Sequence, residues 1–223
     1  MSNYKNFIEQ IIEDDLNKGY KRDELCFRFP PEPNGYLHIG HVKAITLNFE
    51  LGKKYNAPVN LRFDDTNPVK ENTHFVEEIK NNIKWLGYKW SKICYASDYF
   101  EQLYRWAHHL ILNDKAYIDS QTSEQIASQK GTPTNPGTNS PFRNRSKEES
   151  TRIFTEMREG KHIEGSHVLR AKIKMDSQNM LMRDPVMYRI LFKDHHRTGS
   201  KWCIYPMYDW AHGESDYIEQ KSH

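Results

Sequence analysis

Two histidines, His38 and His41, lie three residues apart at the start of a helical pattern, directly after a stretch rich in proline and glycine. The apolar run before that stretch, within residues 25–29, predicts a short buried strand. Pro30 cannot continue a strand ladder, so the chain must leave the sheet there. A strand, a rigid loop and a helix N-terminus present free backbone N–H groups to phosphate. Both imidazoles share one face of that helix and could donate hydrogen bonds to a polyphosphate in a transition state.

Two other interpretations of the histidine pair remain open at this level. Taken alone, histidines at this spacing more commonly belong to a capped, partly buried surface turn. A zinc site is less favoured, because helical zinc ligands usually lie four residues apart and no acid or cysteine stands nearby at matching spacing. We therefore predict no metal site.

Asp64 follows a second predicted strand, residues 58–63, and the helical pattern between the strands completes a strand–helix–strand unit. Such units are parallel and right-handed, and ligands bind beyond the carboxyl ends of their strands. Arg28 stands near the corresponding end of the first strand, so we expect its guanidinium beside the Asp64 carboxylate. Such a pair is suited to hold the carboxylate and the ammonium of an amino acid.

Composition bounds the class of protein and its compartment. The chain has 223 residues, a net charge of +2 and no apolar run long enough for a membrane helix. One large domain or two modest ones are expected. Three cysteines, far apart and odd in number, predict free thiols, a reducing compartment and hence the cytoplasm. Because the net charge is small, any nucleic-acid contact must come from a local basic patch.

A polar segment rich in Gly, Pro, Asn, Ser and Thr, residues 131–146, predicts a long loop. Its simplest interpretation is a solvated linker. Against that, Phe142, Arg143 and Arg145 offer an aromatic ring and two cations of the kind that nucleic acids bind.

Residues 168–175 alternate in the manner of a half-buried strand. Apolar residues occupy one face, and Arg170, Lys172 and Lys174 occupy the other. A basic strand face is usually only solvated surface. Beside the arginine-containing loop, it becomes a candidate track for phosphates.

The string PEPNGYLHIGH, residues 31–41, resembles the first signature of class I aminoacyl-tRNA synthetases, and most closely that of the glutamine-specific members. Residues 62–68, RFDDTNP, resemble the segment of those enzymes whose first aspartate binds the amino acid. The resemblance implies an α/β fold, in which a Rossmann-like parallel sheet binds the nucleotide and carries an inserted α+β acceptor-binding domain. We expect residues 1–97 to form the first half of the catalytic domain, residues 98–200 the insertion, and residues 201–223 the truncated start of the return.

The resemblance also implies roles for individual residues. His38 and His41 are expected to be catalytic, by stabilising a pentavalent phosphorus. Arg28, Asp64 and Tyr208 are expected to hold glutamine, with the tyrosine hydroxyl on the substrate amide, where eukaryotic-type glutamate enzymes carry arginine. The ATP-binding residues implied by the signature are Glu32, Pro33, Asn34, His38, Ile39, Gly40, His41, Val42, Lys43 and Ala44. The residues expected to contact tRNA are Pro133, Arg143, Arg145, Arg170, Lys172 and Lys174.

The expected reaction is ATP-dependent attachment of glutamine to its tRNA through a glutaminyl-adenylate, with Mg²⁺ accompanying ATP and no tightly bound cofactor. The partner is the tRNA acceptor stem, where Pro133 takes the place of a family leucine that helps to open the first base pair. A cytoplasmic monomer without membrane contact is expected. The second signature of the family, a lysine loop, and its anticodon-binding barrels are missing from the sequence, so we expect an N-terminal fragment with impaired or no activity. The alternatives are a glutamate-specific or nondiscriminating synthetase, a small-molecule adenylyltransferase, and a non-catalytic tRNA-binding module.

Overall fold

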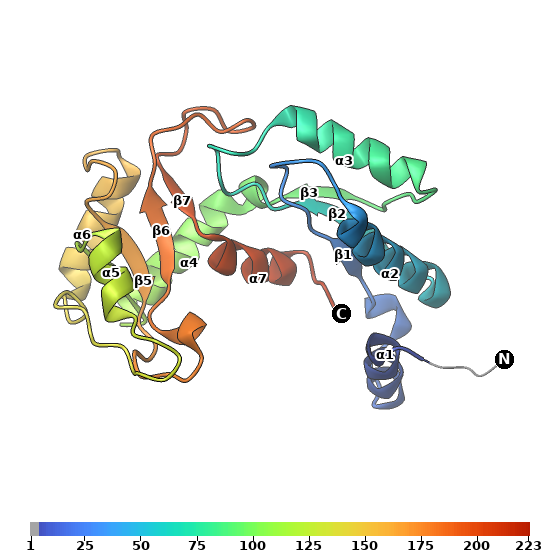
Figure 1. Cartoon of the computed structure of the whole chain (residues 1–223), viewed down its shortest axis with the longest axis horizontal. Helices are drawn as coiled ribbons and strands as arrows, with labels where there is room; N and C mark the ends of the chain where they lie inside the picture. The colour runs from blue at the N-terminus through green and yellow to red at the C-terminus, as the bar shows by residue number, and fades with distance from the viewer. Residues whose placement is uncertain (1–4) are drawn as a thin grey trace. The chain divides into compact units, whose positions relative to one another are not determined.

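The structure, a computed structural model, describes residues 5–223 and forms two compact units. The first unit comprises the described residues up to Asp65 together with Lys70–Ala96 and Gly213–His223. The second unit comprises Thr66–Val69 and Ser97–His212. Each unit has its own sheet and its own apolar core (Figure 1).

A parallel three-stranded sheet, ordered β1-β2-β3, forms the centre of the first unit. Helices α2 and α3 connect consecutive strands, so the unit consists of two strand–helix–strand crossovers, and the predicted Rossmann-like arrangement is confirmed (Figure 1). The middle strand β2 is buried at all five residues, because it has a neighbour on each side. The strands are β1 (Phe27–Phe29), β2 (Val59–Phe63) and β3 (Ile93–Tyr95).

The helices of the first unit begin and end at residues suited to those positions. Asn6 caps the first helix in a reciprocal capping box with Glu9, and Asn72 caps the third through its side chain. Asn56 ends the second helix in the left-handed region, at φ 53°. The helices are α1 (Phe7–Asn17), α2 (Ile39–Tyr55) and α3 (Thr73–Trp85), with the short 3₁₀ helix η1 (Arg22–Glu24) before β1. The fully buried residues that join them to the sheet include Ile12, Ile45, Leu61, Phe63, Ile79 and Ile83.

An antiparallel four-stranded sheet, ordered β4-β5-β6-β7, forms the centre of the second unit. Helices α4 and α6 pack against each other and against β4. The core between them includes Phe100, Leu103, Phe154, Tyr188 and Trp202. The strands are β4 (Ala116–Asp119), β5 (Val168–Ala171), β6 (Val186–Ile190) and β7 (Ile204–Pro206). The helices are η2 (Ala96–Tyr99), α4 (Phe100–Leu112), α5 (Ser123–Gln129), α6 (Lys147–Arg158) and η3 (Met180–Met182), followed by α7 (Tyr208–Ile218), which leads back to the first unit.

Two expected elements differ from the structure. The strand predicted for residues 168–175 ends at Ala171, and Ile173 donates its backbone N–H to the Asp184 carboxylate instead of to a neighbouring strand. The apolar run expected to open the return to the first domain, residues 202–209, instead supplies β7, which pairs with β6 in the second sheet. The chain rejoins the first unit only at Gly213.

Candidate active site

The loop between β1 and α2 is fastened to the segment that follows β2. The backbone N–H of Asp64 donates to the carbonyl of Pro31 at 3.1 Å, and that of Asn72 donates to the carbonyl of Pro33 at 3.0 Å. Prolines lack an N–H, so these two residues can contribute only as acceptors. The loop and the carboxyl end of β2 are therefore held side by side, at the sheet edge where parallel α/β folds bind their ligands.

His38 and His41 cap α2 with their own side chains. Nδ1 of His38 accepts a hydrogen bond from the backbone N–H of Gly40, and Nδ1 of His41 accepts one from the backbone N–H of His38, each at 3.0 Å. A ring nitrogen that accepts a hydrogen bond carries no proton, so the proton of each neutral ring lies on Nε2. The ring centroids are 4.0 Å apart, with His38 exposed and His41 half-buried. The pair thus offers two Nε2–H donors at the positive end of the α2 dipole.

Two features favour a neutral His41 ring and its close contact with His38. Burial lowers the pKa of His41 below its usual value, and the nearby His38 lowers that pKa further. A Cβ at position 40 would lie 2.8 Å from Cε1 of the His38 ring, so glycine there lets the ring fold back over the end of the helix. Gly40 is thus part of the geometry of the site.

Arg28 and Asp64 belong to one network of charges in the first unit. Arg28 contacts the Asp216 carboxylate through Nε and Nη2, both at 2.7 Å, and Arg62 contacts the same carboxylate through Nη1. Arg62, which is fully buried, also donates from Nε to Oδ1 of Asp64 at 2.8 Å. Glu219 lies 3.8 Å from Arg62. The two residues expected to bind the amino acid are thus joined through Arg62 and Asp216, which the sequence reasoning missed.

Opposite charges compensate burial throughout this network. Burial opposes ionisation of Asp216, but the hydrogen bond from Arg28 and the charges of Arg62 and Arg28 outweigh it and lower the pKa of Asp216. Burial likewise opposes the charge on Arg62, yet Asp64, Asp216 and Glu219 raise its pKa overall. An arginine inside a strand predicted to be buried is the sequence signal that Arg62 must have partners. No spacing pattern points to Asp216, which lies 188 positions from Arg28.

Tyr208 opens α7 within the second unit. The residue is 41 % exposed, and its ring lies against that of His212 with centroids 4.9 Å apart. A tyrosine at the surface can present both its ring and its hydroxyl to a ligand. Its contact with the amide of glutamine stays a prediction.

Arg170 does not lie on an exposed basic strand face, as the alternation suggested. Its residue surface is 1 % exposed, Nη1 donates to Asp119 at 2.7 Å, and Nε donates to the carbonyl of Asp184 at 2.7 Å. The physical reason is that β5 lies between two strands and that Met175 covers this face, with Sδ 3.6 Å from Nη2 of Arg170. Arg170 is therefore part of the interior of the second unit, and the expectation of a phosphate track is wrong at this residue.

Arg143 and Arg145 also support the interior of the second unit. Arg143 donates from Nε to the buried carboxylate of Asp184 at 2.7 Å. Arg145 donates from Nη1 to the carbonyl of Ile118 at 2.9 Å. Arg145 thus holds the loop onto β4, and Arg143 holds it onto the segment before β6, roles that the polar composition of the loop did not indicate.

The other residues expected to contact tRNA lie nearer the surface. Pro133 is exposed, and the Lys174 side chain is 69 % exposed, 3.7 Å from Asp176. Lys172 is half-buried and pairs with Asp114 at 2.8 Å. Their contact with a nucleic acid stays a prediction.

A parallel sheet with crossover helices and a helix N-terminus equipped with two imidazole donors defines a nucleotide-binding catalytic domain. The family described as "tRNA synthetases class I (E and Q), catalytic domain" matches residues 24–223, and the chain belongs to this family.

The chain is also similar to curated proteins within this family. Glutamine–tRNA ligase of Clostridium perfringens is 56 % identical over 218 residues, and that of Cronobacter sakazakii is 57 % identical over 219 residues. Each match covers 98 % of this chain and 39 % of the relative, so the chain spans about two fifths of the length of these relatives.

A solved structure shares the fold. A glutamate tRNA ligase from Elizabethkingia meningosepticum, in complex with its amino acid, matches 90 % of this chain and 43 % of its own chain, with a TM-score of 0.62 at 20 % identity. Within residues 5–223, no helix combines the length and the apolar character needed to cross a membrane.

Proposed function

We propose that the chain is the ATP- and amino-acid-binding part of an enzyme that attaches glutamine to tRNA through a glutaminyl-adenylate. The observation that carries this proposal is the self-capping histidine pair at the N-terminus of α2. Its Nε2–H groups are suited to meet phosphate oxygens as negative charge builds on a pentavalent phosphorus. The choice of glutamine rests on the relatives, which are glutamine–tRNA ligases and match 98 % of this chain.

In the first step, the carboxylate of glutamine attacks the α-phosphorus of ATP, and pyrophosphate leaves. His38 and His41 donate hydrogen bonds to the phosphoryl oxygens, and residues 32–34 and 39–44 bind the nucleotide. Mg²⁺ enters with ATP as part of the substrate. Positioning and charge stabilisation supply the catalysis, so no protein nucleophile is needed.

Three side chains recognise glutamine in this proposal. Arg28 binds the α-carboxylate and Asp64 the ammonium, while Arg62 and Asp216 position these two side chains through the network of the first unit. Tyr208 donates its hydroxyl to the side-chain amide. A neutral hydroxyl does not compensate a second carboxylate, and a site built around hydrogen bonds can discriminate by factors of about 10⁴.

In the second step, the 2′-hydroxyl of the terminal adenosine of tRNA takes the acyl group. Pro133, Lys172 and Lys174 are candidates for contact with the acceptor stem, and Arg143 and Arg145 remain candidates beside them. The same proposal includes a monomeric enzyme in the cytoplasm. The three free cysteines support the reducing compartment.

A chimera tests the proposal. Residues 1–223 would replace the corresponding N-terminal part of the Clostridium perfringens relative, and pyrophosphate exchange would be measured with tRNA present. We expect exchange that depends on glutamine, and a far lower rate for the 223-residue chain alone, because it spans about two fifths of its relatives. Equal competition by glutamate would indicate a nondiscriminating enzyme. Binding of acceptor stems without dependence on ATP or glutamine would identify a non-catalytic module and contradict the proposal.

A further inference from the structure

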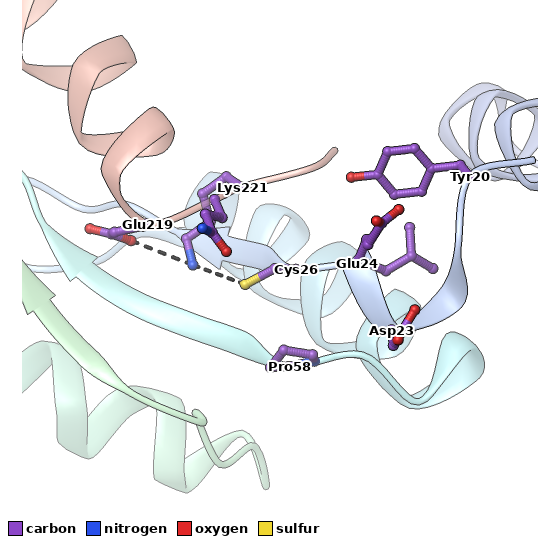
Figure 2. A pocket seen from close by; sticks show the side chains of 9 residues that line it. Tyr20, Asp23, Glu24, Cys26, Pro58, Glu219 and Lys221 are labelled. Atoms are coloured by element: carbon purple, nitrogen blue, oxygen red, sulfur yellow. Dashed lines mark hydrogen bonds and ion pairs between the residues drawn. The ribbon is translucent and has the colours of Figure 1, made fainter.

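Cys26 and Lys221 lie in contact at a cavity in the first unit. Nζ of Lys221 donates a hydrogen bond to Sγ of Cys26 at 3.0 Å, as Figure 2 shows. Cys26 directly precedes β1, and Lys221 follows α7, 195 positions later in the chain. The N–H of Ser222 donates to the carbonyl of Cys26 at 3.1 Å, and the N–H of Cys26 donates to the hydroxyl of Ser222 at 2.9 Å. Hydrogen bonds between the two chain segments, and not side-chain rotamers alone, therefore hold Nζ and Sγ close together.

The surroundings of Lys221 are unusual for a lysine. Its side chain is 3 % exposed, and its ammonium lies 3.5 Å from the carboxylate of Glu219, whose side chain is 2 % exposed (Figure 2). Lysines normally keep their ammonium in water, and a thiol sulfur is a weak acceptor that compensates desolvation poorly. A half-buried thiol beside a lysine is, by contrast, the setting in which cysteines react. The arrangement favours chemistry between these groups over a purely structural contact.

The cavity gives small reagents a route to the pair. Its volume is about 480 Å³, and its lining includes Tyr20, Asp23 and Glu24 besides Cys26 and Lys221 (Figure 2). Asp23 and Glu24 are exposed, and their negative charges disfavour anionic reagents. Hydrogen peroxide is small, neutral and an oxidant of thiols, so it suits this cavity.

We propose that Cys26 and Lys221 form a peroxide-responsive covalent bridge in which one oxygen atom joins Nζ to Sγ. The thiol first takes an oxygen atom from hydrogen peroxide, which oxidises sulfur by two electrons to a sulfenic acid and releases water. Glu219 accepts a proton from the Lys221 ammonium, and a second hydrogen peroxide oxidises the amine to a hydroxylamine with release of water. The hydroxylamine oxygen then attacks the sulfenic sulfur, the S–OH bond breaks, and a third water leaves. One thiol, one amine and two peroxides thus yield one bridge and three waters.

The geometry favours this bridge over a direct bond between sulfur and nitrogen. An intervening oxygen leaves the two atoms close to their present separation of 3.0 Å. A direct bond would require a far closer approach, against the backbone pairing with Ser222. Excess dithiothreitol attacks the sulfur as it would in a disulfide, and four thiol groups restore the thiol and the amine with release of one water and two disulfides.

The bridge has a consequence for stability. It closes a loop of 195 positions and thereby restricts the unfolded chain. It also ties the segment after α7, the helix that carries Asp216, to the start of β1, which carries the partner Arg28. The midpoint of thermal unfolding should therefore rise after oxidation and fall again after reduction. This inference needs only the fold of the first unit and does not depend on the proposed function.

Mass spectrometry of the 223-residue chain after exposure to hydrogen peroxide tests the bridge. Chymotryptic digestion should yield a linked pair of peptides that contain Cys26 and Lys221. The pair should be heavier than the two peptides by one oxygen atom and lighter by two hydrogen atoms, and dithiothreitol should release both peptides. Cys26→Ser and Lys221→Arg should each abolish the linked pair, whereas the matched control Cys203→Ser should retain it.

Two outcomes would overturn the bridge. One is oxidation of Cys26 that ends at the sulfinic or sulfonic acid, or in a disulfide between chains, with no linked pair in the unsubstituted chain. The other is a linked pair of unchanged yield in the Lys221→Arg chain. Fragmentation spectra of the unsubstituted chain locate the bond directly. The test therefore stays decisive even if one of the variants fails to fold.

Discussion

The backbone N–H of His38 donates to Nδ1 of His41, so the second histidine holds the first at the N-terminus of α2. The same hydrogen bond leaves the proton of the neutral His41 ring on Nε2. The structural cap and the proposed catalytic donor are therefore opposite ends of one imidazole. A substitution can keep one end and remove the other.

Replacing His41 with glutamine should separate the two roles. Glutamine at this position of a capping box can accept the same hydrogen bond from the backbone N–H of His38. The free energy of unfolding should stay within about 0.5 kcal/mol of the original. Pyrophosphate exchange by the chimera should fall by about 10²-fold, as for the loss of one transition-state donor. His41→Ala should lose activity and also about 1 kcal/mol of stability. Unchanged exchange in the glutamine variant would remove His41 from the chemistry.

Stability should also depend on pH through His41. Its pKa in the folded chain lies below the unfolded value of 6.5, so the unfolded chain binds more protons between the two values. The stabilisation is present above the unfolded pKa and is lost as the pH falls through the folded pKa. Urea unfolding at about pH 8 and about pH 5 should therefore show the original chain losing stability relative to His41→Gln on acidification. If the difference in unfolding free energy between the original chain and His41→Gln is the same at both pH values, this linkage is excluded.

Asp216→Asn should destabilise the first unit. The substitution removes the carboxylate shared by Arg28 and Arg62 and leaves the fully buried Arg62 with less compensation. We expect a loss of about 3 kcal/mol in the free energy of unfolding, measured in urea. Glu77→Gln makes the same acid-to-amide change in an ion pair between the exposed Glu77 and the half-buried Lys80, and should cost less than about 1 kcal/mol. Equal losses in both variants would show that the network contributes no more than a surface pair.

The sequence predicted the first unit well because its signals are local. Pro30 ends the first strand, Asn56 ends α2, and the apolar pattern between them marks the crossover. The pairing of Arg28 with Asp216 could not be predicted in the same way, since it joins residues 188 positions apart with no shared motif.

The second unit shows a different limit. Alternation in residues 168–175 predicted one continuous strand with a basic face, but the strand ends at Ala171, and Met175 and the carbonyl of Asp184 cover Arg170. Arg170 thus belongs to the interior. A period of two identifies the faces of a strand, and only the tertiary fold decides which of them meets water.

Gly40→Ala should disturb the site while the fold persists. The added Cβ would lie 2.8 Å from Cε1 and 3.0 Å from Nδ1 of His38, so the ring must move and its hydrogen bond from residue 40 must weaken. We expect weaker binding of ATP by calorimetry and a loss of about 1 kcal/mol of stability. Gly213→Ala is the matched control, because nothing lies within 4 Å of its added Cβ and it stands inside α7. That substitution should stabilise the chain by about 0.5–1 kcal/mol and leave ATP binding unchanged.

The proposed catalytic role of the histidine pair depends on the position of the imidazole protons. Long-range proton–nitrogen correlation spectra of the ¹⁵N-labelled chain should show the Nε2–H tautomer for both His38 and His41. Addition of ATP with Mg²⁺ should shift both Nε2 signals, while those of His109 in the second unit should not move. Nδ1–H tautomers in the pair, or Nε2 signals that stay in place while the chain binds ATP, would exclude the two imidazoles as donors to the phosphates.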